Sequence, residues 1–197
     1  MHQELIEFVE KCELPTEIAN FSLYAFVENS TNKEHLAIVL GSIQYKESVL
    51  ARIHSQCLTG ESLFSLRCDC RFQLTESLKK IKKNGSGIVF YLQQEGRSIG
   101  LLNKIKAYKL QDKGYDTVEA NHKLGFADDP RDYKIVSTMG KYLKIASIDL
   151  MTNNPNKIRA LKGSGLKVNK RIPIKSKATE YNRDYLKTKA NKLGHLL

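Results

Sequence analysis

The sequence predicts an α/β fold of mixed α+β character, in which a single domain holds a mixed sheet flanked by helices. Three observations predict it. A chain of 197 residues that is 41% hydrophobic has the length and the apolar content for one core of its own. The N-terminal third has the pattern of short strands, and from residue 72 onward helical segments alternate with strands.

The strands of the N-terminal third are rich in β-branched, leucine or aromatic residues and are separated by Asn, Ser or Gly. We expect them at 21–27, 35–40 and 48–54. Residues 72–83 place apolar side chains on one face and lysines on the other, and then stop at Asn84-Gly85, which is a C-terminal helix signal. A buried strand is expected at 87–92.

The second half of the chain alternates helices and strands. Helices are expected at 99–111 and 133–143, and a strand at 147–151 leads into a helix opened by Pro155. A polar loop with Pro173 precedes a last helix at 184–193. We divide the single domain, residues 1–197, into a strand-rich segment of residues 1–50, a catalytic core of residues 51–172 and a helical tail of residues 173–197.

Charge and hydropathy narrow the possible partners. The net charge of +11 favours anionic partners, and residues 156–179 carry eight Lys or Arg and no acid. That run is interpreted as a solvated basic face. No window approaches the roughly 18 uninterrupted apolar residues of a membrane span, and the first 14 residues lack a signal-peptide pattern. We therefore expect a cytoplasmic protein without a membrane partner.

The cysteines carry the clearest chemical signal. In the reducing cytosol, clustered cysteines point to metal binding or catalysis, whereas the isolated Cys12 is expected to be a small buried hydrophobe. Cys57 follows a strand and Cys68 and Cys70 precede a helix, so three thiols converge and suit zinc. Ordinary buried cysteines are the alternative. The spacing leaves open whether His54 completes a closed structural site or leaves an open catalytic one.

Three further segments place polar groups next to helix starts. Residues 94–100 form a glycine-punctuated loop between a strand and a helix, where backbone N–H groups and an arginine can meet phosphate oxygens, unless the loop is only a turn. Residues 126–133 crowd carboxylates and an arginine before a helix, either for chemistry or as a helix cap. Residues 152–157 again follow a strand and open a helix. Two such loops at strand ends predict one shared crevice.

Together these segments closely resemble the GTP cyclohydrolase II family, which starts riboflavin synthesis, and the resemblance implies a RibA-like fold. It is strong from Arg52 to Arg171 and weak before that. The shared strings occur in the family's order. They are RIHSQCLTGESLFSLRCDCRFQL from Arg52, QQEGRSIGLLNKIKAYKLQDKGYDTVEANHKLGF from Gln93, DDPRDY from Asp128, TNNPNK from Thr152 and YLKTKANKLGHLL at the end.

The resemblance also implies a role for each site residue. It makes the three clustered cysteines the ligands of one zinc ion per subunit, with the site open and His54 in the nucleotide-binding stretch. Magnesium is expected with the substrate phosphates. The implied contacts to GTP come from Arg52, Ile53, His54, Ser55, Gln56, Gln73, Glu95, Gly96, Arg97, Thr117, Thr152 and Lys157, and the implied zinc ligands are Cys57, Cys68 and Cys70.

The implied reaction opens the imidazole ring of GTP, releasing formate and pyrophosphate and leaving a diaminopyrimidinone ribosyl phosphate. Water activated by zinc is expected to attack carbon 8 while Tyr108 stabilises or protonates the developing centre. The resemblance makes Asp129 a general base and Arg131 a nucleophile towards the α-phosphorus. Because an arginine stays protonated, we interpret Arg131 as a charge clamp on the α-phosphate.

Three positions depart from the family pattern, which has Glu where Gln56 stands, Gly at Arg71, and Asn or Gly at Ser98. The lost charge at Gln56 bears most directly on specificity or product. One alternative is therefore a specialised paralogue that retains the formyl group or the pyrophosphate. The alternative from another class is a zinc-stabilised nucleic-acid-binding module, but clustered exposed aromatics are missing and we expect no nucleic-acid partner. The resemblance implies a homodimer.

Overall fold

The computed structural model describes residues 5–196 and contains one mixed sheet of seven strands in the order β1-β2-β3-β5-β4-β6-β7. Strands β1, β2, β3 and β5 pair antiparallel, whereas β5, β4, β6 and β7 run parallel. The α/β prediction with a mixed sheet is confirmed. The strands are β1 Ile6–Pro15, β2 Asn20–Glu28, β3 Lys33–Leu40, β4 Val49–Ser55, β5 Gly87–Leu92, β6 Ser147–Met151 and β7 Lys167–Ile172.

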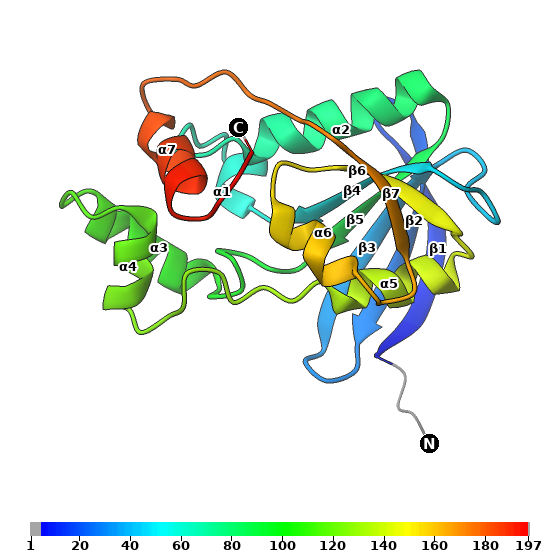
Figure 1. The fold of residues 1–197 in the computed structure, drawn as a ribbon, viewed down its shortest axis with the longest axis horizontal. Helices are drawn as coiled ribbons and strands as arrows, with labels where there is room; N and C mark the ends of the chain where they lie inside the picture. Colours follow the sequence, from blue (N-terminus) through cyan, green and yellow to red (C-terminus); the bar gives the residue numbers. More distant parts are fainter. Residues whose placement is uncertain (1–4, 197) are drawn as a thin grey trace.

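Helices cover both faces of the sheet, and further helices gather beyond the carboxyl ends of its parallel strands (Figure 1). On one face α2 buries Ile81 against Phe21 and Val89, and on the other α5 and α6 close the larger apolar cluster, which includes Met139 and Leu161. The helices are α1 Leu58–Glu61, α2 Cys70–Asn84, α3 Leu101–Gln111, α4 Thr117–Lys123, α5 Lys134–Tyr142, α6 Pro155–Leu161 and α7 Arg183–Asn191.

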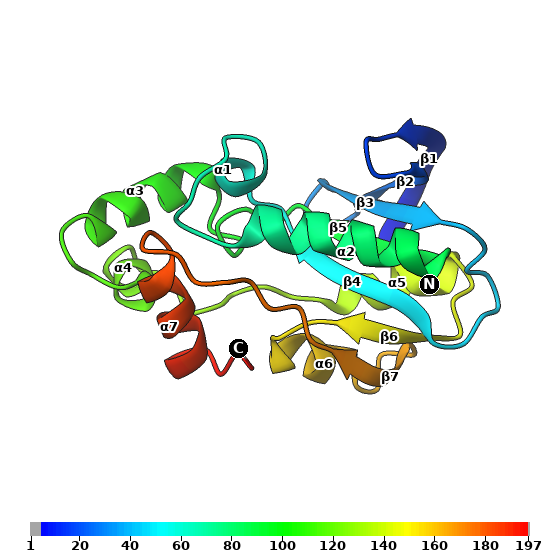
Figure 2. The same cartoon turned by 90° about the horizontal axis from the view of Figure 1, so that it is seen from above.

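The parallel region of the sheet determines where the polar loops meet. Because β4, β5 and β6 run in the same direction, their carboxyl ends lie at one edge of the sheet. Figures 1 and 2 show α3, α4 and α7 beyond that edge, with the C-terminus close by. The sheet thus fixes the chain segments that follow Ser55, Leu92 and Met151, and α7 returns to them from the end of the chain.

The expected elements are found with their ends moved by one or two residues, and the C-terminal glycine signal of α2 is confirmed by Gly85 at φ +76°. Four elements of the structure were not predicted from the sequence: β1, β7, α1 and α4. Strands β1 and β7 lie at the two edges of the sheet, where charged side chains interrupt the apolar pattern and none but Ile6 is buried, as is common for edge strands. The helices α1 and α4, of four and seven residues, are too short for a periodic apolar pattern.

The expectation that Cys12 is buried is wrong. Cys12 lies on the edge strand β1 and is exposed. An edge strand has a neighbour on one side alone, and in β1 most of the side chains face solvent. As for the membrane, no helix within residues 5–196 has the length and apolarity needed to cross one.

Candidate active site

An open cleft lies at the carboxyl ends of β4, β5 and β6. Gln56 follows β4, Gln94 follows β5 and Thr152 follows β6, and all three side chains line the cleft. This is the position at which open α/β sheets place their ligands. The crevice expected from loops after strand ends is therefore present.

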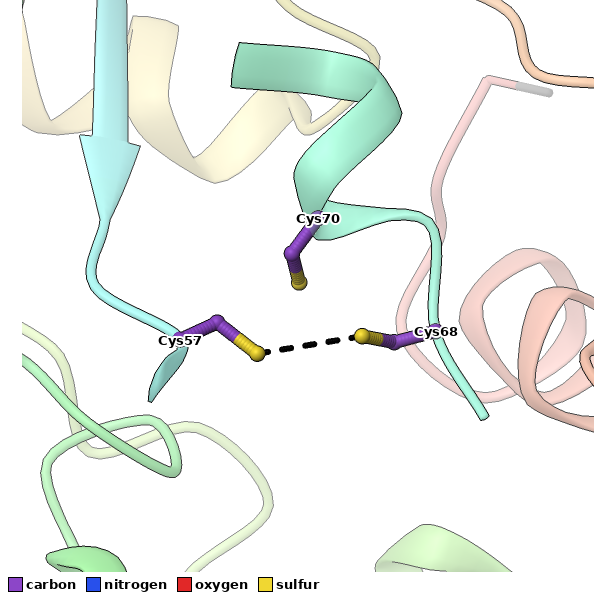
Figure 3. Close-up of side chains that lie close together, drawn as sticks. All are labelled: Cys57, Cys68 and Cys70. Carbon is purple, nitrogen blue, oxygen red and sulfur yellow. Dashed lines mark hydrogen bonds between the residues drawn. The ribbon is translucent and has the colours of Figure 1, made fainter. Parts of the chain in front are cut away.

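Three thiols that line this cleft point toward one another (Figure 3). The sulfur atoms of Cys57, Cys68 and Cys70 lie within 4.8 Å of one another, and those of Cys57 and Cys68 are 3.7 Å apart. Two sulfurs that each lie about 2.3 Å from a tetrahedral zinc ion are roughly 3.8 Å apart. Across the described residues, these three thiols form the group whose ligand atoms are close enough to share a metal. The cluster fits zinc.

The cluster also favours a cation electrostatically. Hydrogen bonds from the thiols of Cys68 and Cys70 lower the pKa of Cys57, and its bond to Cys57 raises the pKa of Cys68 to about 11. A negative charge on the cluster is therefore favoured at the Cys57 sulfur, and a divalent cation would release protons from the other thiols. Gly60 leaves the room for this, because a Cβ at Gly60 would lie 2.7 Å from the Cys68 sulfur.

His54 is not a member of the sulfur group. Its Nε2 lies 2.9 Å from Oε1 of Glu61, and the hydroxyl of Tyr91 donates to the other Glu61 oxygen at 2.6 Å. Burial lowers the pKa of His54, which favours the neutral ring. His54 thus lines the cleft with Glu61 as its partner, and the group of possible metal ligands consists of the three cysteines without it.

The loop after β5 is a tight turn that is stabilised by hydrogen bonds of Glu95 and of its own backbone. Gly96, Arg97 and Ser98 have φ values of +60°, +62° and +73°. Glu95 closes the turn, accepting from the backbone N–H of Leu58 at 2.6 Å and from that of Gly96 at 3.0 Å. The backbone N–H of Ser98 likewise donates to Gln94 O at 3.1 Å. What the loop offers a ligand is mainly the Arg97 guanidinium, which lines the cleft.

Asp129 and Arg131 form a bidentate pair. Nε of Arg131 donates to one Asp129 oxygen at 2.6 Å, and Nη2 donates to the other at 2.6 Å. Burial would raise the pKa of Asp129, but the Arg131 hydrogen bonds and charge hold it below its usual value. Arg131 lines the cleft and Asp129 lies behind it. At the start of α5, the backbone N–H of Lys134 donates to the Asp132 carboxylate at 2.9 Å, whereas Asp129 binds Arg131.

Buried cations line the floor of the cleft. Arg52 donates to Met151 O at 3.0 Å and to the Gln73 side chain, and burial lowers its pKa to about 10, which leaves it charged. Lys157 donates to Ile53 O at 2.8 Å, and burial followed by repulsion from Arg52 lowers its pKa. Such a surplus of positive charge suits phosphates. The basic side chains that line the cleft are Arg52, Arg67, Arg97, Lys104, Arg131, Lys157 and Lys189, and the acidic ones are Asp69 and Glu95.

Nearly all predicted site residues come together in this cleft. Two of them stand behind its wall: Ile53 is fully buried in β4, and Asp129 reaches the cleft through Arg131. Those that line it are Arg52, His54, Ser55, Gln56, Cys57, Cys68, Cys70, Gln73, Glu95, Gly96, Arg97, Tyr108, Thr117, Arg131, Thr152 and Lys157.

Several lining residues escaped the sequence analysis. Lys104 lies one helical turn before Tyr108 on α3, a spacing that places both on one face and was available from the sequence. Asp69 stands between two of the cysteines and is buried, with its carboxylate bound to Lys189 of α7. Tyr185 and His195 also come from the end of the chain. Because their partners are distant in sequence, no local pattern marks these last contacts.

Comparison with known proteins identifies relatives over almost the whole chain. The GTP cyclohydrolase II family model matches residues 7–173. A "GTP cyclohydrolase-2" of Azotobacter vinelandii is 53% identical over 98% of this chain and 92% of its own, and one of Hahella chejuensis is 54% identical over 98% and 93%. A "Riboflavin biosynthesis protein" of Vibrio vulnificus is 50% identical over 98% of this chain, which spans 52% of that relative.

A solved structure shares the fold at low identity. The two-domain 3,4-dihydroxy-2-butanone 4-phosphate synthase RibBX of A. baumannii superposes with a TM-score of 0.53 and 16% identity. The match covers 89% of this chain and 42% of that one. It supports the architecture of a mixed sheet flanked by helices.

Proposed function

Because the chain belongs to the GTP cyclohydrolase II family and is an enzyme of that kind in riboflavin biosynthesis, we propose that it hydrolyses GTP in a zinc-dependent reaction. The reaction opens the imidazole ring, releases formate and pyrophosphate, and leaves 2,5-diamino-6-(5-phosphoribosylamino)pyrimidin-4(3H)-one. The observation that carries the proposal is the three-thiol cluster, with sulfurs within 4.8 Å, at the edge of a cation-lined cleft.

Cys57, Cys68 and Cys70 would hold the zinc ion, one per subunit. Bound there, zinc would supply a Lewis acid that activates water at neutral pH. On the cleft side, Thr59 connects the cluster with Tyr108: its hydroxyl oxygen lies 3.8 Å from the Cys57 sulfur and 3.1 Å from the Tyr108 hydroxyl oxygen. Carbon 8 of the guanine is proposed to bind on this side.

Tyr108 is proposed to donate its proton to the reacting ring. Burial raises the pKa of the Tyr108 hydroxyl, so it stays protonated at neutral pH and is able to donate. The Arg67 guanidinium lies over the ring with 4.9 Å from its central carbon to the ring centroid, which limits the movement of the ring. A fixed hydroxyl donor close to the metal site suits the protonation of a ring nitrogen.

The triphosphate is proposed to lie over the buried cations. Arg52, Arg131 and Lys157 surround the floor of the cleft, and Arg97 comes from the loop after β5. Both acids that line the cleft are already bound to lysines, Asp69 to Lys189 and Glu95 to Lys104. Magnesium would therefore come with the phosphates of the substrate instead of a carboxylate cage, in keeping with its preference for phosphate oxygens and water.

Arg131 is proposed to clamp the α-phosphate, with Asp129 holding the guanidinium in place. Burial would lower the pKa of Arg131, but Tyr133 and the hydrogen bonds of Asp129 raise it, which favours a permanent cation. Both Asp129 oxygens accept from Arg131, and a lowered pKa makes Asp129 a weak proton acceptor. These contacts favour the positioning role of Asp129 over that of a general base.

We also propose that the protein is cytoplasmic and that it forms a homodimer.

Product analysis tests this function. Zinc-replete protein with magnesium and GTP is expected to yield formate, pyrophosphate and the diaminopyrimidinone monophosphate, identified by mass. A product that keeps the formyl group or the triphosphate would instead identify a specialised paralogue, for which Gln56 is the first position to restore to Glu. Cys68→Ser is expected to abolish turnover while circular dichroism stays close to that of the native protein. Turnover by zinc-free protein would refute the metal requirement.

A further inference from the structure

One buried lysine contacts the cysteine cluster directly. Nζ of Lys104 lies 3.1 Å from the sulfur of Cys57 and 2.7 Å from Oε1 of Glu95. The Lys104 side chain is 11% exposed and so is that of Glu95. The ammonium therefore sits between a thiol and a carboxylate, largely out of water, on the wall of the cleft.

The position of this ammonium is determined on both sides. Glu95 is anchored by the backbone N–H groups of Leu58 and Gly96, which hold its carboxylate beside Lys104. On the helix side, the backbone N–H of Lys104 donates to Gly100 O at 3.1 Å. A Cβ at Gly96 would lie 3.1 Å from the Cβ of Lys104, so the loop and α3 are in close contact. Lys104 is thus aimed at Cys57 by the turn after β5.

The contact between Lys104 and Cys57 would balance the charge of a metal bound by three thiolates. Three thiolates around a divalent cation carry a net charge of −1 in a partly buried site, which is unfavourable without a compensating cation. An ammonium that donates to a thiolate compensates that charge and draws electron density from the sulfur. Lys104 supplies such a donor to Cys57.

We infer that Lys104 is a positioning residue of the metal centre, which holds and polarises the ligand sulfur of Cys57 through an N–H···S hydrogen bond fixed by Glu95. This inference rests on the proposed zinc site. It assigns Glu95 a support role at the metal in addition to any contact with guanine. Groups around a metal ligand that orient it typically change metal affinity about 10- to 100-fold when removed.

Cobalt(II) substitution measures the effect on the sulfur itself. The full-length protein and Lys104→Met are titrated with cobalt(II), and the thiolate-to-metal charge-transfer band is recorded; zinc dissociation constants follow from competition with a chromophoric chelator. Lys104→Met is expected to bind zinc at least about tenfold more weakly and to move the band to longer wavelength, because a sulfur without its hydrogen bond gives up electrons more easily. Lys104→Arg, which keeps a cationic donor, is expected to stay closer to the native band.

Lys106→Met is the matched control, since Lys106 lies on the same helix and is exposed. A band position and a zinc dissociation constant of Lys104→Met equal to those of Lys106→Met would overturn the inference. Lys104→Gln, uncharged but polar, carries the same test if the methionine variant does not fold. The outcome separates the two levels of the proposal: a native protein without a charge-transfer band refutes the metal site, whereas a native band unchanged in both Lys104 variants refutes the role of Lys104 alone.

Discussion

Lys189 of the last helix donates a hydrogen bond of 2.8 Å to Asp69, which stands between two cysteines 120 residues earlier in the chain. Gln73 donates to the other oxygen of this carboxylate at 2.6 Å, and the Lys189 and Asp69 side chains are 10% and 2% exposed. The pair ties α7 to the loop that carries the thiols. The end of the chain thus contributes to the wall of the cleft.

Replacing Lys189 is expected to destabilise the fold. Lys189→Met leaves a buried carboxylate without its charged partner, and breaking a buried pair costs about 3 kcal/mol. Urea denaturation measures the free energy of unfolding. Lys187→Met, on an exposed position of the same helix, is the control and is expected to be neutral within about 0.5 kcal/mol. Equal stabilities of the two variants would contradict a stabilising role of the pair.

Asp129 and Arg131 are expected to act as one unit in catalysis. Arg131→Ala should lower kcat about 100-fold, as expected for loss of a charged donor to the reacting phosphate. Asp129→Asn should lower it less, and the double variant should equal Arg131→Ala, because the carboxylate acts through the guanidinium. Steady-state kinetics of the four proteins gives the coupling. Losses that multiply in the double variant would speak for an independent role of Asp129, such as that of a general base.

The pH dependence of stability is expected to contain a contribution from His195. Burial lowers the pKa of His195 to about 3, assisted by nearby cations. A histidine whose pKa is lower in the folded state stabilises the fold above its unfolded pKa of about 6.5, and this contribution is lost as pH falls from there towards 3. The cations are Lys189, Arg131, Lys157 and Arg97.

Urea denaturation between pH 7.5 and 4.5 tests this contribution on the whole chain. Native stability should fall below about pH 6.5 by up to about 1.4 kcal/mol per pH unit, the slope for one proton. His195→Gln should flatten the curve in that window. An identical pH dependence of the two proteins would show that the end of the chain leaves its site before the histidine is protonated.

Ser98 is expected to be a position where glycine stabilises the protein. Its φ of +73° lies in the left-handed region, where a Cβ is unfavourable, and the family pattern has Asn or Gly at this place. Ser98→Gly should raise the free energy of unfolding by about 0.5 to 1 kcal/mol. Thermal denaturation checks this against Ser62→Gly, whose φ of −102° gives glycine no advantage. A destabilised Ser98→Gly would mean that the serine side chain makes a compensating contact.

The amino-acid sequence was sufficient for those features of this protein that depend on short stretches of chain. The spacing of Cys57, Cys68 and Cys70, a strand before the first and a helix at the last, was enough to predict convergent thiols. The glycine and asparagine loops after two strands were enough to predict a crevice, because parallel strands bring their carboxyl ends to one edge. The resemblance of these segments to the GTP cyclohydrolase II family then led to GTP as the expected substrate.

Only the three-dimensional packing shows which polar side chains already have a partner and which are free to take part in the reaction. Whether Asp129 is a base or a support depends on where the Arg131 side chain points, and whether Glu95 serves guanine or the metal depends on Leu58 and Lys104. The same holds for Lys189, whose partner lies 120 residues away. Contacts of this kind arise from the packing of distant elements, where burial and charge balance select the partners, and a local sequence pattern carries no trace of that choice.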